Sequence, residues 1–325
     1  MTITRRAAAL ACFAGLPLAL SRAARADDYP SRPIRLIIPF GAGGPTDVFT
    51  RALAEELRKV LGQPFVSENR PGAGTVIGTE VAAKAAPDGY TLLMVSATQT
   101  VNETLIANKT YKLMTDFVPV AQLFHSELVM VVHPSIGVKN VKEFIALAKA
   151  KPGTLNYASS GIGSNYHMAG ELFKNLTGTD IVHVPYRGST GARTDILAGN
   201  VQMMFDSVPT MAPFIKADKV IALGTSGTKR SVTLPDVPTL AEAGVPGYEA
   251  TIWIGMMAPK NTPQPIVDRL NTEINKIISR TDIHDSWVQQ DAYPDPMTAA
   301  QFGDHIQAEI VKWAKLIKAN NIKAG

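Results

Sequence analysis

The 325-residue sequence contains a single cysteine, Cys12, which lies close to its start. From residue 27 onward the chain therefore has no disulfide, no thiolate nucleophile and no cysteine ligand for a metal. Clustered positive charge is also missing. Residues 1–26 contain four of the 32 basic residues and no acidic residue. Their charge of +4 equals the formal net charge of the whole chain, so the rest of the chain is neutral. Because binding to nucleic acid or to a membrane surface depends on clustered Lys and Arg, we expect neither.

Motifs of common hydrolases and nucleotide-binding enzymes are absent as well. Ser159, Ser160 and Ser164 have no G-x-S-x-G nucleophile elbow around them, and no G-x-x-x-x-G-K-[ST] loop occurs. The six histidines include no H-E-x-x-H motif and no close pair with metal-ligand spacing. The glycine run at 41–45 lacks the third glycine of a dinucleotide fingerprint, because Thr46 stands there. We therefore expect a protein that is not an enzyme, with no catalytic residue, no metal and no cofactor.

Residues 1–26 have the pattern of an export signal. A short basic start precedes the apolar run 7–20, and Ala24-Arg25-Ala26 forms a small-x-small cleavage site. This run of about 14 residues is shorter than the roughly 20 that a membrane-spanning helix needs. We predict cleavage after Ala26 and a periplasmic mature chain. The paired arginines near the start fit either the Sec or the twin-arginine route, and a lipid-anchored start at Cys12 is the alternative.

Apolar runs alternate with helical patterns along the mature chain. The run 34–40 ends at Gly41, and a helical pattern follows up to Gly62, which predicts a strand, a glycine loop and a helix. The same order recurs at 155–176, where the glycine loop is 159–164. Further strands are predicted at 91–95, 128–132, 181–186, 201–206 and 220–224. Such alternation is typical of an α/β fold with largely parallel sheets.

The C-terminal part of the chain predicts two long helices that pack against the core. One begins at Thr262-Pro263 and the other at Thr298, and each has apolar residues at spacings of three and four. Before them lies an extended stretch at 246–254, which is suited to crossing between two lobes.

Each glycine-rich loop, 41–45 and 159–164, leads directly into a predicted helix. The first turn of a helix has N–H groups without intrahelical partners and a partial positive charge, so such a loop forms an anion site without Lys or Arg. Two of these sites facing each other would hold a small acid at both ends. The hydroxyls of Thr46, Ser159, Ser160 and Ser164 either add donors or serve only as helix N-caps.

Several segments resemble the Bug-type substrate-binding proteins of tripartite tricarboxylate transporters. They are YPSRPI (29–34), PFGAGGPTD (39–47), NRPGAGTVIG (69–78), PDGYTLL (87–93), VPYRG (184–188), PDVPT (235–239) and GVPGY (244–248). The resemblance implies a two-lobed, type II-like periplasmic binding-protein fold, with two mixed sheets flanked by helices and joined by crossing hinge strands. We expect lobe 1 to comprise 27–125 and 252–325 and lobe 2 to comprise 126–251, with the ligand cleft between them.

The resemblance also implies which residues bind the ligand, largely through backbone N–H groups and bound waters. Arg187 stands where the family usually has lysine, and Asp206 follows an apolar run, so for both a direct contact and a structural role remain open. The complete expected set is Phe40, Gly41, Ala42, Gly43, Gly44, Pro45, Thr46, Asp47, Ser96, Thr98, Ser159, Ser160, Gly161, Gly163, Ser164, His167, Tyr186, Arg187 and Asp206.

By the same resemblance, the protein closes on a small organic acid and delivers it to a permease with a large and a small integral membrane subunit. We predict a dicarboxylate of four to six carbons, with aromatic acids, tricarboxylates and acidic amino acids as the alternatives. A sensor that presents its ligand to a membrane kinase is the alternative partner arrangement. We expect the receptor to be a monomer.

Overall fold

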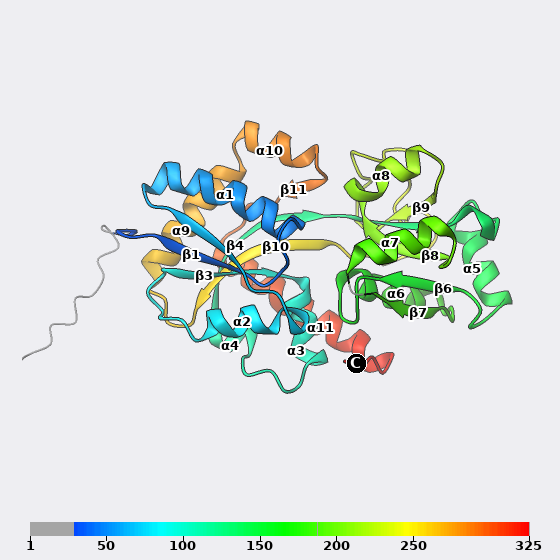
Figure 1. The fold of residues 1–325 in the computed structure, drawn as a ribbon, viewed down its shortest axis with the longest axis horizontal. Coiled ribbons are helices and arrows are strands. Elements are labelled where there is room, and N and C mark those ends of the chain that lie inside the picture. The colour runs from blue at the N-terminus through cyan, green and yellow to red at the C-terminus, as the bar shows by residue number, and fades with distance from the viewer. Residues whose placement is uncertain (1–28, 187, 325) are drawn as a thin grey trace, which may run out of the picture.

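The computed structural model describes residues 29–186 and 188–324, which form an α/β fold with two lobes (Figure 1). The predicted export signal and Arg187 lie outside the described residues. Within the described ranges, no helix combines the length and the apolar character needed to cross a bilayer.

Lobe 1 is built around a six-stranded mixed sheet. Its strands run in the order β11-β4-β10-β3-β1-β2. β1 pairs in parallel with β2 and β3, whereas β10 is antiparallel to both of its neighbours, β3 and β4. The strands are β1 (Ile34–Ile38), β2 (Phe65–Asn69), β3 (Thr91–Ser96), β4 (Phe117–Ser126), β10 (Ile252–Pro259) and β11 (Ala292–Pro294).

Helices cover both faces of this sheet. Successive strand residues point to opposite faces, so Leu36 belongs to one core cluster and Ile37 to another. The first cluster is covered by α1 (Pro45–Leu61), α9 (Gln264–Ile278) and α10 (Thr281–Val288). The second is covered by α2 (Val76–Ala83), α3 (Ala97–Leu105), α4 (Leu113–Asp116) and the first half of α11 (Ala299–Ala319), and a 3-10 turn, Ala73–Thr75, precedes α2.

Lobe 2 is built around a five-stranded mixed sheet with the order β7-β6-β8-β5-β9. β6 is parallel to β7 and β8, whereas β5 is antiparallel to β8 and β9. The strands are β5 (Leu128–Val132), β6 (Asn156–Ser159), β7 (Val182–Pro185), β8 (Met203–Ser207) and β9 (Ile221–Thr225). The helices are α5 (Val141–Ala150), α6 (Asn165–Thr177), α7 (Ser189–Ala198) and α8 (Val208–Lys216), with a 3-10 turn at Pro134–Ile136.

Three segments connect the lobes. Glu127 alone separates β4 of lobe 1 from β5 of lobe 2, and the chain returns from lobe 2 into β10. The long helix α11 belongs to both lobes, because Phe302 packs in a lobe 1 core cluster whereas Trp313 and Ile317 pack in a lobe 2 cluster. Its last turns therefore extend beyond the lobe 1 assignment expected from the sequence.

The two predicted strand, loop and helix units are present as β1 with α1 and β6 with α6. The helix α1 begins with Pro45 and ends at Gly62, whose φ of 73° is a left-handed conformation that favours glycine. The largely parallel arrangement inferred from strand alternation is wrong for the strands at and beside the crossing, β4, β5, β9 and β10. These pair antiparallel with their neighbours and make both sheets mixed, as the family resemblance implied.

Candidate functional site

The first glycine loop connects β1 to α1, and Figure 1 shows α1 beginning on the side of lobe 1 that faces lobe 2. Gly41, Ala42 and Gly43 are exposed, and Gly44 is the N-cap of α1 without a side-chain cap. Among the described residues, the N–H groups of Thr46 and Asp47 have no acceptor. Two unpaired donors thus remain at the positive end of α1.

The Asp47 carboxylate holds this loop in place. Its Oδ2 accepts the Gly43 N–H at 2.9 Å, and its Oδ1 accepts bonds from Arg51 Nε at 2.9 Å and Asn69 Nδ2 at 3.0 Å. The Arg51 hydrogen bond, followed by those from Gly43 and Asn69, keeps the pKa of Asp47 below its usual range. Asn69 also donates to the Phe40 carbonyl at 3.1 Å. The carboxylate is therefore engaged inside lobe 1.

Ser96 and Thr98 lie at the start of α3, where Ser96 forms the N-cap. The Thr98 N–H donates to Ser96 Oγ at 3.2 Å, and the Ser96 N–H donates to Gln99 Oε1 at 3.0 Å. This reciprocal pair is a capping box, a local arrangement that stabilises a helix start. The Ser96 hydroxyl and the Thr98 N–H are thus used within lobe 1.

The second glycine loop, 159–164, is held by its own side chains. The Gly161 N–H donates to Ser159 Oγ at 3.1 Å, and the Gly163 N–H donates to His167 Nδ1 at 3.0 Å. Ser164 is the N-cap of α6 and accepts the His167 N–H at 3.2 Å. Within the described ranges, no acceptor is found for the Asn165 and Tyr166 N–H groups in the first turn of α6. The start of α6 thus offers unpaired donors, as the start of α1 does.

His183 is a residue of this site that the sequence analysis did not find. The register of β6 with β7 places it opposite Tyr157, where its ring stacks on His167 with 3.9 Å between ring centroids. His183 Nε2 lies 2.7 Å from Ser159 Oγ. Burial lowers the pKa of His167 to about 4 and that of His183 to about 3, so both rings are neutral near pH 7.

Tyr186 and Asp206 make their contacts within lobe 2. The Tyr186 N–H donates to the Ser159 carbonyl at 3.0 Å, and its hydroxyl donates to Asp195. Asp206 is fully buried at the end of β8, where its Oδ2 accepts bonds from Arg193 Nε and Nη2 at 3.0 and 2.9 Å. Arg193 was not singled out from the sequence, because only the fold brings α7 beside the end of β8.

The second loop touches lobe 1 directly. A Cβ added at Gly163 would lie 2.6 Å from Leu105 Cδ2 on α3, and φ at Gly163 is +78°. A larger residue at 163 would therefore press on Leu105 of α3. Asn102, also on α3, donates to the Gly74 carbonyl at 2.6 Å and links α3 to the 3-10 turn before α2. The loop 159–164 and α3 thus lie side by side.

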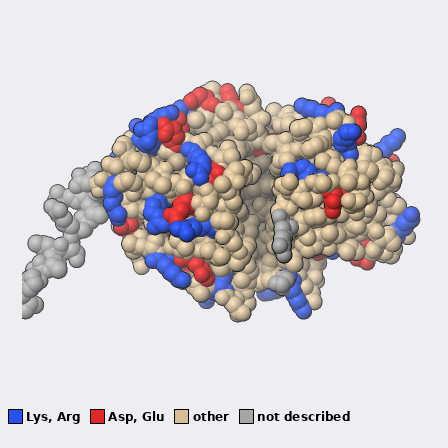
Figure 2. All heavy atoms as spheres, viewed as in Figure 1, with Lys and Arg blue, Asp and Glu red and all other residues tan. Residues whose placement is uncertain are grey.

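Figure 2 shows a furrow between the two lobes, and most of its visible wall is formed by residues other than Lys, Arg, Asp and Glu. No group of three or more His, Cys, Asp or Glu side chains within the described ranges could hold a metal ion. Many side chains at the loops hold the backbone in place, and the available donors include the N–H groups at the starts of α1 and α6. Such an arrangement suits small anions.

The family model for the tripartite tricarboxylate transporter family receptor matches residues 49–322. The protein BugT of Bordetella pertussis is 38% identical to this chain over 328 residues, which cover 99% of each sequence. Among solved structures, Rpa4515 of Rhodopseudomonas palustris with adipate has a TM-score of 0.82 and 34% identity, covering 91% of this chain and 99% of that one. MatC of the same species with bound malate has a TM-score of 0.78 and 31% identity, covering 89% and 100%.

Proposed function

Because this chain belongs to the tripartite tricarboxylate transporter receptor family, we propose that it is a periplasmic receptor for a dicarboxylate of four to six carbons. Lobe closure would trap the acid, and the loaded receptor would deliver it to a permease with a large and a small integral membrane subunit. Family and fold are those of solute-binding receptors. The relatives solved with adipate and with malate support an aliphatic diacid of this length.

The observation that carries the proposal is the pair of helix starts in different lobes. The first turns of α1 and α6 both have N–H groups without an acceptor among the described residues. If each helix start takes one carboxylate, a diacid connects lobe 1 to lobe 2 and holds them closed. Each charge-assisted hydrogen bond contributes about 1.5–3 kcal/mol.

The other parts of the proposed site have supporting roles. The loops 40–47 and 159–164 place the N–H donors, and Asp206 with its partner Arg193 supports the lobe 2 wall. Hinge bending at Glu127 and at the start of β10 would let lobe 2, residues 126–251, move against the rest. The signal at residues 1–26 would direct export to the periplasm and would be cleaved after Ala26, so the intact mass of the exported protein should correspond to a start at Asp27.

A thermal-shift panel tests the ligand class directly. It compares diacids of four to six carbons with their mono-amides, benzoate and citrate. A ligand at about 100 times its Kd stabilises the native state by roughly 2.7 kcal/mol, which gives a measurable change in Tm. A diacid should bind roughly ten- to a hundredfold more tightly than its mono-amide, because the amide leaves one set of donors facing a neutral group. Equal shifts for both would contradict recognition of two carboxylates.

A further inference from the structure

Arg193 on α7 is a cationic side chain that the fold brings to the edge of the lobe 2 sheet beside the second glycine loop. β6 and β8 are parallel neighbours, and their register, continued by two residues, places Asp206 of β8 level with Ser160. Asp206 Oδ2 accepts hydrogen bonds from Arg193 Nε at 3.0 Å and Nη2 at 2.9 Å. The guanidinium therefore lies at the carboxyl ends of parallel strands, where α/β clefts bind their ligands.

The ion pair of Arg193 and Asp206 has its positive end on the outside. The Asp206 side chain is 0% exposed, whereas the Arg193 side chain is 19% exposed. Both bonds to Asp206 use the same oxygen, and no acceptor for Arg193 Nη1 is found in residues 29–186 and 188–324. Because a guanidinium has five N–H groups, its outer side can still bind a carboxylate.

Tyr166 connects this ion pair to the start of α6. Burial, followed by the charge of Asp206 and a hydrogen bond to it, raises the pKa of the Tyr166 hydroxyl. The hydroxyl therefore stays protonated and donates to Asp206. The Tyr166 N–H is one of the two donors in the first turn of α6 that have no acceptor among the described residues. Asp206 thus holds the guanidinium and the start of α6 beside each other.

The position of Arg193 is fixed before any ligand binds. Its neighbour Ala192, together with Ile196, packs in a lobe 2 core cluster with Ala158 of β6 and Met204 of β8. This packing places α7 against the strands, and Asp206 then orders the guanidinium. A carboxylate would bind such a preorganised group with little further loss of side-chain freedom.

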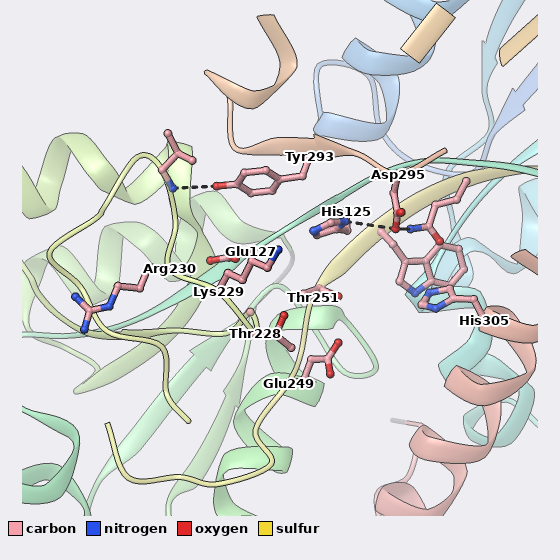
Figure 3. A pocket seen from close by; sticks show the side chains of 14 residues that line it. His125, Glu127, Thr228, Lys229, Arg230, Glu249, Thr251, Tyr293, Asp295 and His305 are labelled. Atoms are coloured by element: carbon pink, nitrogen blue, oxygen red, sulfur yellow. Dashed lines mark hydrogen bonds and ion pairs between the residues drawn. The ribbon is translucent and has the colours of Figure 1, made fainter. Parts of the chain in front are cut away.

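Another group of cations lies beside the hinge strands, around a cavity of about 550 Å³ (Figure 3). The charged residues that line this cavity are two cations and three carboxylic acids, namely Lys229, Arg230, Glu127, Glu249 and Asp295. No ligand residue expected from the sequence lines it. Arg230 is also bonded to an acid outside this group, because its Nε donates to Glu242 Oε2 at 2.8 Å. The hinge cavity therefore suits an acidic ligand less well than the sheet edge beside Arg193 does.

We propose that Arg193 is a specificity-determining residue of the diacid site, where its outward N–H groups bind the carboxylate that the start of α6 receives. This inference rests on the proposed function, which places one carboxylate at each helix start. A guanidinium adds a full charge and a planar fork that matches a carboxylate to the backbone donors of α6. The lobe 2 end of the site would therefore select a charged group over a neutral one.

Isothermal titration calorimetry of the full exported chain with succinate, glutarate and adipate tests the proposal. Arg193→Lys keeps a cation to pair with Asp206 but has no second nitrogen to face outward, and Arg193→Met removes the charge. Each variant should weaken binding of the diacid that the wild type binds most tightly by tenfold or more. Arg230→Met is the matched control, because it removes the same charge from an exposed arginine that pairs with Glu242, and it should bind like the wild type.

Arg193→Met leaves Asp206 buried without its ion-pair partner, so a second set of variants separates binding from folding. The double variant Arg193→Met/Asp206→Asn removes both charges together and keeps a buried side chain of similar shape. Its circular-dichroism spectrum should match that of the wild type, and its diacid binding should still be tenfold or more weaker. Asp206→Asn alone keeps the outward guanidinium and should lose less affinity than Arg193→Met.

The outcomes distinguish the role of Arg193 from the choice of ligand. Wild-type diacid affinity in Arg193→Lys or in the folded double variant, or an equal loss in Arg230→Met, would overturn the role of Arg193 and leave the diacid proposal intact. If the wild type binds benzoate or citrate instead of a diacid, the diacid proposal fails, and the same variants titrated with that acid decide the role of Arg193. No binding of any of these acids by the wild type would overturn both.

Discussion

Glu127 should make the folded protein less stable as the pH rises from mildly acidic to mildly alkaline. Its carboxyl group is buried at the crossing between the lobes, where burial and then Asp291 raise its pKa from the ordinary value of 4.5 to about 8. Between these two pKa values the folded state binds more protons than the unfolded state. The favourable contribution of the protonated group is therefore complete below about pH 4.5 and is lost as the pH rises toward about 8.

The size of this effect follows from proton linkage. A difference of one pKa unit corresponds to about 1.4 kcal/mol. From the two pKa values of 4.5 and about 8, Glu127 should reduce the free energy of unfolding by about 2 kcal/mol between about pH 5.5 and about pH 7. Glu127→Gln removes the titrating group and keeps a side chain of similar shape. The free energy of unfolding of Glu127→Gln, relative to that of the wild type, should therefore rise by the same amount between about pH 5.5 and about pH 7.

Urea unfolding of both proteins at a series of pH values measures this difference. His167 and His183, whose pKa values are lowered, make both proteins more stable as the pH rises from about 4 to about 6.5, so their contribution cancels in the difference. Any constant packing cost of the substitution also cancels in the slope. A difference between Glu127→Gln and wild type that stays level or shrinks with rising pH would refute the reasoning.

Three further predictions concern the proposed diacid site. Gly163→Ala should weaken diacid binding tenfold or more in calorimetry, because its Cβ would lie 2.6 Å from a lobe 1 leucine at a φ of +78°. The control is Gly178→Ala, at the end of α6 with open space around it. This variant should bind the diacid normally and lose about 1 kcal/mol of stability. Equal diacid affinities in the two variants would argue against a role for the loop 159–164. His183→Ala should weaken diacid binding several-fold by loosening the loop 159–164, whereas His284→Ala, at an exposed position, should not. An unchanged diacid affinity in His183→Ala would show that the stacked histidines do not contribute to the site. A chelator should leave diacid binding unchanged, and a loss of binding in EDTA would reveal a metal.

The elements that the sequence predicts well are those defined by local signals. Thr298, where the sequence predicts the last long helix to begin, is the N-cap of α11 and forms a capping box with Gln301. The sequence also predicts the two strand, loop and helix units, β1 with α1 and β6 with α6. In each unit an apolar run, a glycine loop and a helical pattern follow one another within about 30 residues.

The long strand β4 was missed for a physical reason. Its sequence contains Pro119, a residue that removes a ladder donor and usually argues against an interior strand. In the structure, Pro119 pairs with Met257 at a register shift between β4 and β10, and this irregularity accommodates the proline.

The contacts that hold the proposed diacid site depend on pairings between distant segments. His183 reaches Ser159 only because β6 and β7 pair in one particular register, and Arg193 reaches Asp206 only because α7 packs beside β8. No short-range pattern in the sequence specifies either contact. Sequence motifs therefore indicated which loops matter but not which side chains hold them.

Most of the polar side chains in the two glycine loops cap helices or hold the loop backbone, which explains why the loop motifs identify a class of ligand better than a particular acid. Ser96 and Ser164 cap helices, Asp47 and His167 accept N–H groups of the loops, and Ser159 bonds to both Gly161 and His183. The groups left for an anion in the proposed site include backbone N–H donors at helix starts, which respond to negative charge and carry no side-chain specificity. If the proposed site takes one carboxylate at each helix start, we expect discrimination between acids of different length to depend on the distance between the two helix starts when the lobes are closed. Because α11 packs in both lobes, we expect it and the hinge to influence that distance, so residues far from the loops would help to determine the chain length of the ligand.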